Sequence, residues 1–226
     1  MTHAAGPLRP GYAAELDQLR LQVELMAVRV DQNLERMRDV LRSGDEDLAL
    51  RTITSDDDID DMSVSLTERC YDLLAREQPV AGDLRFIVSV LRVLGEFERV
   101  GDLALRVAKL APQHAVLMSN PSTFELLVAL ADAAIERYRD AMRAWSGPSP
   151  DIALHLLKEP ALAQHLESRL TEELVALSGS DASAVVVHTL VAGKALERIS
   201  DHAAIIGARL LFLVTGDAGH LAQEVR

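Results

Sequence analysis

Apolar residues near the start of the chain recur every three or four positions. These positions are Tyr12, Leu16, Leu19, Val23, Met26, Val30, Leu34, Met37 and Leu41. The spacing places one apolar stripe along an α-helix of about eight turns. It therefore predicts a long helix that packs against its neighbours through a single face, with Ser43-Gly44-Asp45 ending it.

The same periodicity predicts five further helices. They span residues 46–76, 82–111, 122–145, 150–177 and 181–215. Most prolines lie between these segments, because proline lacks an N–H group and clashes with the preceding helical turn. Pro160 lies inside the fifth segment and predicts a kink or a restart, while Gly216 is placed to close the last helix. No alternating strand pattern of useful length is present, so the predicted fold class is all-α.

An internal repeat divides the six predicted helices into two groups of three. The segment 97–104 aligns with 196–203, with identical Glu, Arg, Asp and Ala residues at matching positions. The repeat predicts two tandem, structurally similar three-helix bundles joined by the loop between Pro112 and Pro121. The predicted domains are a flexible N-terminus at 1–11, a first bundle at 12–112, a second bundle at 121–216 and a C-terminal tail at 217–226.

The charge balance of the chain argues against two classes of partner. The 226 residues carry a formal net charge of −12, so nucleic acid and anionic membrane surfaces would repel the protein. The longest apolar run, 203–214, is interrupted by Arg209 and is too short to span a bilayer, so no membrane insertion is expected. Cys70 is the single cysteine, which excludes an intrachain disulfide. Since Met1–Gly11 lacks an apolar signal-peptide core, a soluble cytoplasmic protein is expected.

Each copy of the repeat carries two carboxylates four residues apart. Glu98 and Asp102 share one helix face, as do Glu197 and Asp201. Seven-residue steps place both glutamates in an apolar seam. Like charges at this spacing destabilise an isolated helix by a few tenths of a kcal/mol, so a compensating cation is expected. Carboxylates suit Mg, Mn, Fe or Zn, whereas the alternative is structural ion pairing with the arginines of the same motifs.

Two further acidic segments extend this pattern. Asp56 and Asp60 stand four residues apart on the second predicted helix, and Asp60 is in register with the apolar seam. The corresponding part of the fifth helix has Glu159, but Ala163 takes the place of the second acid. Any metal site in the second half is therefore poorer in ligands than its counterpart. For the Asp56 segment, a solvated acidic turn is the alternative interpretation.

Basic residues form a ribbon along the third predicted helix. Arg85, Arg92, Arg99 and Arg106 recur every seven residues on an otherwise acidic protein. Guanidinium groups in such a row can dock an acidic surface or hold phosphate through paired hydrogen bonds. The alternative is a solvated face whose arginines pair with neighbouring acids. His202, in the second copy of the repeat, is either a metal ligand or a polar neighbour.

Several segments resemble the PhoU family. The resemblance rests on Gln-Pro-Val-Ala-Gly-Asp-Leu-Arg at 78–85, on the doubled Glu-Arg-x-x-Asp motif at 98–102 and 197–201, and on Phe-Leu-Val-Thr-Gly at 212–216. It covers nearly the whole chain, and the doubled motif is its most specific part. The resemblance implies two similar three-helix bundles in one elongated molecule. It also implies a non-enzymatic, cytoplasmic negative regulator of phosphate uptake and phosphate signalling.

The same resemblance implies partners and a metal. Family members are thought to link the ATPase subunit of the phosphate transporter to a membrane sensor histidine kinase. Some bind metal clusters through Glu/Asp-x-x-x-Asp motifs on the second and third helices of each half. Carried over by position, the ligands are Asp56, Asp60, Glu98, Asp102, Glu197 and Asp201, with Glu159 matching in type. Ala163 departs from the pattern.

Two hypotheses of function remain from the sequence. The leading one is an adaptor that acts through protein contacts, binds metal and forms a homodimer. The alternative is a carboxylate-bridged metalloenzyme on a helical-bundle scaffold. Against the enzyme, the Glu-x-x-His pair of ferritin-like oxidases is missing and no nucleophile–base pair stands out. The apolar run 205–214 is predicted to be core or a homodimer surface.

Overall fold

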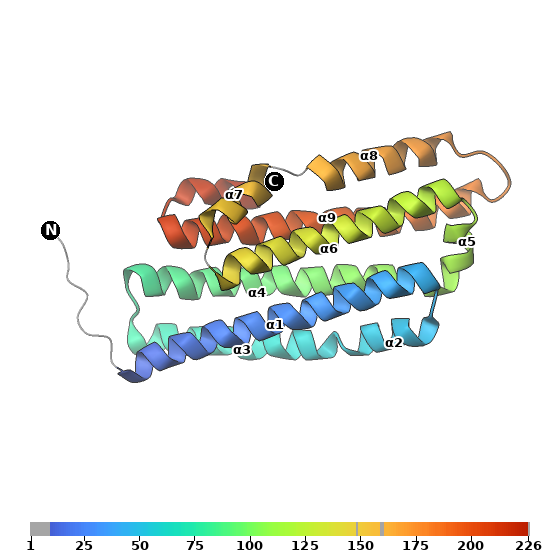
Figure 1. The fold of residues 1–226 in the computed structure, drawn as a ribbon. Helices are drawn as coiled ribbons and strands as arrows, with labels where there is room; N and C mark the ends of the chain where they lie inside the picture. Colours follow the sequence, from blue (N-terminus) through green and yellow to red (C-terminus); the bar gives the residue numbers. More distant parts are fainter. Residues whose placement is uncertain (1–9, 148, 159–160, 226) are drawn as a thin grey trace.

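The computed structural model describes residues 10–147, 149–158 and 161–225, which form an all-α structure without a β-strand (Figure 1). The prediction of an all-α helical bundle is confirmed. The described elements are α1 (Pro10–Ser43), α2 (Glu46–Thr54), α3 (Asp57–Glu77), α4 (Ala81–Ala108), η1 (Ala111–Gln113), α5 (His114–Met118), α6 (Pro121–Ser146), α7 (Pro150–Lys158), α8 (Ala161–Ala176), α9 (Ala182–Thr215) and η2 (Ala218–Val225), where η marks a 3₁₀-helix.

Local capping chemistry fixes several helix ends. The Asp45 carboxylate accepts a hydrogen bond from the Leu48 N–H (2.8 Å) at the start of α2. Asn120 does the same for the Thr123 N–H (3.0 Å) at the start of α6. Each cap satisfies an N–H group that has no partner inside its helix. Gly216 follows α9 with a φ of 73°, the left-handed conformation predicted for a closing glycine.

The second predicted helix is broken, so the prediction of one helix over 46–76 is wrong. α2 ends at Thr54 and α3 begins at Asp57. At the break, the Ser55 hydroxyl donates to Asn33 Oδ1 of α1 (2.6 Å), and Asp56 is buried. Short polar side chains can hydrogen-bond locally in place of the helical ladder, which explains a break in a Ser-Asp-Asp-Asp run. The break brings a carboxylate into the bundle.

The fifth predicted helix also consists of two helices. α7 and α8 lie on either side of residues 159–160, which are outside the described residues. This arrangement agrees with the restart predicted at Pro160. The loop predicted between Pro112 and Pro121 is largely helical, because η1 and α5 occupy it.

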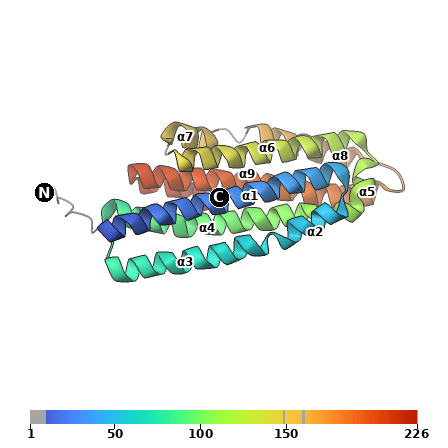
Figure 2. The ribbon, with the colours of Figure 1, turned by 60° about the horizontal axis from the view of Figure 1, so that its bottom comes forward.

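The helices of the two halves lie side by side along their length. α1 and α4 of the first half pack on α6 and α9 of the second, with α3 outside one layer and α7 and α8 outside the other (Figures 1 and 2). α4 and α9 run antiparallel, and the Arg85 guanidinium near the start of α4 lies beside Gly216 at the end of α9. The two copies of the repeat therefore meet near the middle of this helix pair.

One continuous hydrophobic core joins the two halves. The fully buried Tyr138 of α6 donates its hydroxyl hydrogen bond to the Ala27 carbonyl of α1 (2.9 Å). Its ring also meets Phe97 of α4 edge to face, with 6.2 Å between centroids. The domain boundaries at 112 and 121 stay a prediction. Of the two predicted end segments, residues 1–9 lie outside the described residues, and residues 218–225 form η2, which contacts α9.

The apolar run near the C-terminal end belongs mainly to this core. Ile206, Leu210 and Leu211 are buried, while Val214 is exposed. The sequence predicted that residues 205–214 form either core or a homodimer surface, and core describes most of the segment. In the described part of the chain, no helix combines the length and the apolar character needed to cross a bilayer.

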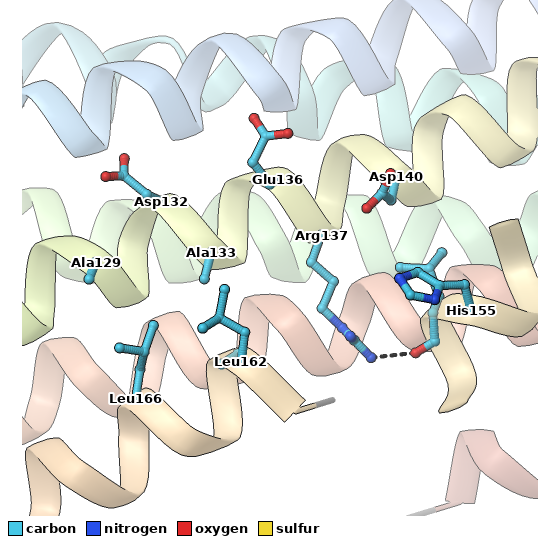
Figure 3. A pocket seen from close by; sticks show the side chains of 11 residues that line it. Ala129, Asp132, Ala133, Glu136, Arg137, Asp140, His155, Leu162 and Leu166 are labelled. Carbon is cyan, nitrogen blue, oxygen red and sulfur yellow. Dashed lines mark hydrogen bonds between the residues drawn. The ribbon is translucent and has the colours of Figure 1, made fainter. Parts of the chain in front are cut away.

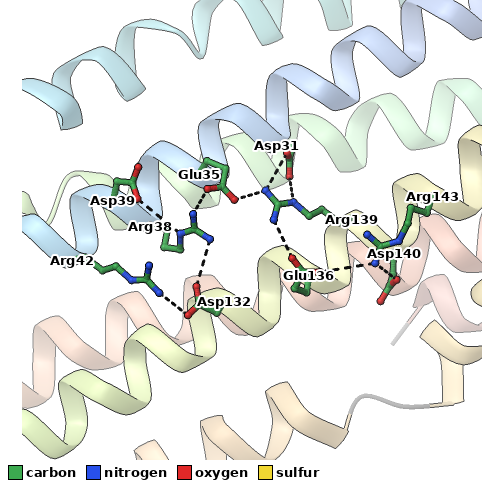
Figure 4. Close-up of polar contacts among 10 residues, drawn as sticks. All are labelled: Asp31, Glu35, Arg38, Asp39, Arg42, Asp132, Glu136, Arg139, Asp140 and Arg143. Carbon is green, nitrogen blue, oxygen red and sulfur yellow. Dashed lines mark hydrogen bonds and ion pairs between the residues drawn. The ribbon is translucent and has the colours of Figure 1, made fainter.

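An ion-pair network lies along the contact between α1 and α6 (Figure 4). The Arg139 guanidinium of α6 donates to both Asp31 oxygens (2.8 and 3.4 Å) and to Glu35 of α1. One turn or more away, Arg42 of α1 pairs with Asp132 of α6 (2.7 Å). A single exposed ion pair contributes little to stability, but a connected network of pairs at the edge of the core helps to fix the register of α1 against α6.

Candidate functional site

Three carboxylates of the first half form one like-charged group, which we call the first-half cluster: Asp56, Asp60 and Asp102. Asp56 lies at the break between α2 and α3 and is only 5% exposed. Its Oδ1 accepts a long hydrogen bond (3.4 Å) from the Asn33 side chain of α1. Asp60 of α3 and Asp102 of α4 lie nearby and are exposed.

Burial and repulsion disfavour the charged forms of Asp56 and Asp60. The pKa of Asp56 is raised from 3.8 to about 6, chiefly by burial and then by the charges of Asp60 and Asp102, while the hydrogen bond from Asn33 acts in the opposite direction. The pKa of Asp60 is also raised, first by burial and then by Asp102. Within the described chain, none of the three forms an ion pair with a cationic side chain. In that part of the chain, none of the three carboxylates thus has a direct counter-ion, and only Asp102 also lines a groove with arginine side chains.

A glycine of the repeated motif makes room for the buried carboxylate. A Cβ added at Gly101 would lie 2.7 Å from Asp56 Oδ1 and 3.8 Å from the Ile59 side chain. Any residue larger than glycine on this face of α4 would have to displace the carboxylate. In the second copy of the repeat the same position holds Ser200, so this close approach is a property of the first half alone.

Glu98 does not join the first-half cluster as expected. It is exposed and is not among the groups that raise the pKa of Asp56 or Asp60, whereas its neighbours Phe97 and Val100 are buried. The predicted apolar seam through Glu98 is therefore wrong. The buried face of α4 passes through Phe97, Val100 and Ala104 in three- and four-residue steps, so Glu98 lies beside it and not on it.

The acids of the second half have cations beside them. Lys194 Nζ lies 2.9 Å from Glu197 and 2.6 Å from Glu167 of α8. Burial and Glu197 raise the pKa of Asp201, but His202, Arg137 and Arg198 oppose that increase. Glu197 is thus ion-paired, but with Lys194 and not with an arginine of its own motif, which the alternative of structural ion pairing had named.

Arg137 is the cation that the sequence did not reveal. It points from α6 into a pocket of about 560 Å³ between α6, α7 and α8, where it donates to the Leu156 carbonyl (Figure 3). Its Nε also donates to the Ser200 carbonyl of α9 (3.1 Å). Ala163, the residue that departs from the acidic pattern, lines the same pocket. Glu159 lies outside the described residues.

The two halves therefore differ in charge compensation. The first presents Asp56, Asp60 and Asp102 without a paired cation, and the second places Arg137 and Lys194 beside its acids. Among the described residues, no three His, Cys, Asp or Glu side chains are arranged so that they could hold a metal ion together. Metal binding by the predicted ligands stays a prediction.

Glu96 is another polar residue that the sequence analysis missed, and it is buried. It is 5% exposed, and its carboxylate accepts from Arg99 (2.6 Å) on one oxygen and lies 2.6 Å from His202 Nδ1 on the other. Because a carboxylate only accepts hydrogen bonds, His202 must donate from Nδ1. His202 is accordingly a polar neighbour that joins α9 to α4. The sequence signal that could have revealed Glu96 is its i, i+3 spacing from Arg99, which is typical of an ion pair on a helix.

Comparisons with known proteins agree with this architecture. The family model described as PhoU domain matches residues 23–111. The chain is 30% identical over 208 residues to the phosphate-specific transport system accessory protein PhoU homolog of Xylella fastidiosa, covering 91% of this chain and 86% of that protein. The chain belongs to the PhoU family. PhoU of Escherichia coli is 27% identical over 216 residues, or 94% of this chain and 89% of that protein.

Solved PhoU structures share the fold. The crystal structure of PhoU from Pseudomonas aeruginosa matches with a TM-score of 0.86 at 28% identity, covering 91% of this chain and 100% of that one. PhoU from Streptococcus pneumoniae matches with a TM-score of 0.82 at 23% identity, covering 91% of this chain and 98% of that one. The helical bundle described above is thus the PhoU fold over almost the full chain.

The close approach at Gly101 gives a first prediction. Gly101→Ala should lower the free energy of unfolding by about 1 kcal/mol, because the new methyl group displaces a buried carboxylate. Gly95→Ala on the same helix should raise it by about 0.5–1 kcal/mol, since its added Cβ meets nothing closer than 3.7 Å and alanine favours helix. Urea unfolding measures both. If both substitutions changed the free energy of unfolding in the same direction and by the same amount, the close contact between Gly101 and the Asp56 carboxylate would be contradicted.

The pKa of Asp56 gives a second prediction. Its pKa is higher in the folded protein (about 6) than the ordinary 3.8, so ionised Asp56 costs stability above about pH 6 and costs nothing below about pH 4. Asp56→Asn should therefore stabilise the protein at pH 7.5, on the order of 2–3 kcal/mol. The gain should disappear as the pH falls through this window.

Urea unfolding of Asp56→Asn across pH 4–8 measures this effect. The exposed neighbour Asp58 supplies the matched control, and Asp58→Asn should change stability by less than about 0.5 kcal/mol at every pH. An Asp56→Asn effect that is independent of pH would show that the carboxylate titrates normally.

Proposed function

We propose that this chain is an accessory regulator of phosphate-specific transport. The observation that carries the proposal is similarity over almost the whole length, because this chain covers 84% or more of curated relatives that are named as accessory proteins of phosphate-specific transport. A solved PhoU structure at a TM-score of 0.86 supports it. The proposed output is a protein contact and not a chemical reaction, which fits relatives that are named as accessory proteins.

The proposal includes a specific mode of action. The chain acts in the cytoplasm as a negative regulator that links the ATPase subunit of the phosphate transporter to a sensor histidine kinase. The resemblance of the doubled Glu-Arg-x-x-Asp motif to the family supports this mode. Long helices with exposed side chains on α1, α3 and α9 offer surfaces for two partners at once. A homodimer belongs to the same proposal.

Deletion of the gene tests the regulatory role. Without the protein, phosphate-starvation genes should be expressed in phosphate-rich medium, and a plasmid copy should restore repression. Reporter activity in high and low phosphate measures the outcome. Full repression in the deletion strain, with any second copy of the gene also removed, would reject the proposed role.

Co-purification tests the adaptor mode separately. Tagged protein should retain the transporter ATPase subunit and the kinase, each when co-expressed alone and both when co-expressed together. If the tagged protein retained either partner alone but never both together, the result would support regulation but contradict an adaptor that bridges the two.

We also propose that the first-half cluster binds a metal ion of the Mg, Mn, Fe or Zn type. Asp56, Asp60 and Asp102 supply hard oxygen ligands without a paired cation, and a metal would relieve the repulsion that contributes to the raised pKa values of Asp56 and Asp60. These carboxylates do not converge on one point in the described structure, so metal binding requires their side chains to rotate, and Glu98 could join as a ligand by the same kind of rotation. In the second half, cationic side chains already lie beside Glu197 and Asp201, so a bound metal would stabilise those acids less.

This asymmetry predicts unequal effects of two double substitutions. Metal that binds the folded state should raise the melting temperature by mass action. Replacing Glu98 and Asp102 with alanine should abolish most of that increase, whereas the same change at Glu197 and Asp201 should matter less. Calorimetric scans with Mg, Mn, Fe(II) and Zn measure the effect, with chelator as baseline. Equal losses from both pairs would refute the asymmetry, and no increase with any metal would refute the site.

A further inference from the structure

The two copies of the repeat lie on α4 and α9, which run antiparallel (Figure 1). A polar pocket lies between these two helices. Its volume is about 200 Å³. We call it the arginine pocket, and it is lined by Arg99, Asp102, Leu103, Arg106, Arg198 and His202. Arg99 and Arg198 occupy equivalent positions in the two copies of the motif. The packing of α4 against α9 brings both side chains to the same pocket.

Guanidinium groups dominate the charge of the arginine pocket. Three of them face one carboxylate, that of Asp102. Arg106 and Arg198 are exposed and have no ion pair with any described residue. An arginine presents a planar fork of N–H donors that matches tetrahedral oxyanions. This pocket therefore has the chemistry to bind an anion on a protein whose net charge of −12 repels anions at long range.

Buried groups beneath the pocket hold its walls in place. Glu96 fixes Arg99 through one carboxylate oxygen (2.6 Å) and His202 through the other (2.6 Å), and both Glu96 and His202 are buried. Arg99 is thus oriented before any ligand arrives. Preorganised donors lose less entropy on binding than flexible ones.

We propose that the arginine pocket binds a tetrahedral oxyanion that still carries a proton, and that inorganic phosphate is this ligand. Arg106 and Arg198 donate to its oxygens, with Arg99 held as a third donor. The Asp102 carboxylate accepts a hydrogen bond from the protonated oxygen of the ligand, which keeps its proton. Phosphate keeps at least one proton near neutral pH, whereas sulfate keeps none. Asp102 should therefore select phosphate over sulfate, since a fully deprotonated anion meets a repelling carboxylate.

This inference goes beyond the proposed function, which assigns no small-molecule ligand to the chain. A phosphoryl group on a partner protein offers the same chemistry as free phosphate, and a monoester probe distinguishes the two sources. The test uses purified protein in vitro, so its failure would leave the regulatory role untouched. Loss of the regulatory role would likewise leave the binding result standing.

Isothermal titration calorimetry with inorganic phosphate, sulfate and phosphoserine tests the proposal. Chelator is present throughout, so that no metal on Asp102 contributes. The full chain should bind phosphate at least about tenfold more tightly than sulfate. Arg106→Gln and Arg198→Gln should each weaken phosphate binding about tenfold, because each removes a charge-assisted hydrogen bond. Asp102→Asn should bring the affinities for phosphate and sulfate close together.

Arg92→Gln is the matched control. Arg92 is an exposed arginine of the same helix, two turns from Arg99 and not among the residues that line the pocket. Its substitution should leave phosphate affinity unchanged. Melting temperatures confirm that each variant is folded before its affinity is compared.

Four outcomes would overturn the proposal. Phosphate could fail to bind at millimolar concentration, or Arg92→Gln could weaken binding as much as Arg106→Gln does, which would indicate a general charge effect. Sulfate could bind the full chain as tightly as phosphate, which would remove the role of Asp102. Binding of phosphoserine without binding of phosphate would reject the free ion and point to a phosphorylated partner.

Discussion

The burial of one carboxylate, Asp56, is the constraint on which the first half depends. Keeping it inside requires a break between α2 and α3, a hydrogen bond from Asn33, and a glycine at position 101 of α4. None of these features neutralises the charge. A buried, unpaired carboxylate costs stability, and its pKa rises as a result. A fold that retains such a cost usually does so at a functional site.

The second half has the same helices and a different charge arrangement. There Arg137 enters from α6, and Lys194 pairs with Glu197, so the acids already have counter-charges. The two copies of the repeat thus differ in their ion pairs: the acids of the first-half cluster have none among the described residues, whereas Glu197 of the second half pairs with Lys194. Between them, the antiparallel contact of α4 and α9 brings Arg99 and Arg198 together on a polar groove. The acids of the first half, the acids of the second half and the arginine pocket all lie on similar helices, so their charges are what distinguish them.

Helical periodicity and proline positions predicted the fold well, because both act through local backbone geometry. The break at Ser55–Asp56 was missed, since it depends on contacts with Asn33 and Gly101 that lie far away in the sequence. Four-residue spacing pointed to Asp56 and Asp60, the repeat pointed to Asp102, and the family resemblance grouped all three. Glu98 was placed in the apolar seam by a strict seven-residue step, whereas the buried face of α4 follows three- and four-residue steps beside it. Arg137 shares no motif with the acids it approaches, so only the packing of α6 on α9 reveals it.

The central claim is that Asp56 is buried among like charges without a counter-ion. Carboxyl carbon-13 NMR, with the resonance assigned through Asp56→Asn, measures the pKa of this side chain directly in metal-free protein. The account predicts a midpoint of about 6. A midpoint near the ordinary value of 3.8 would contradict it, because the carboxylate would then be either solvated or paired.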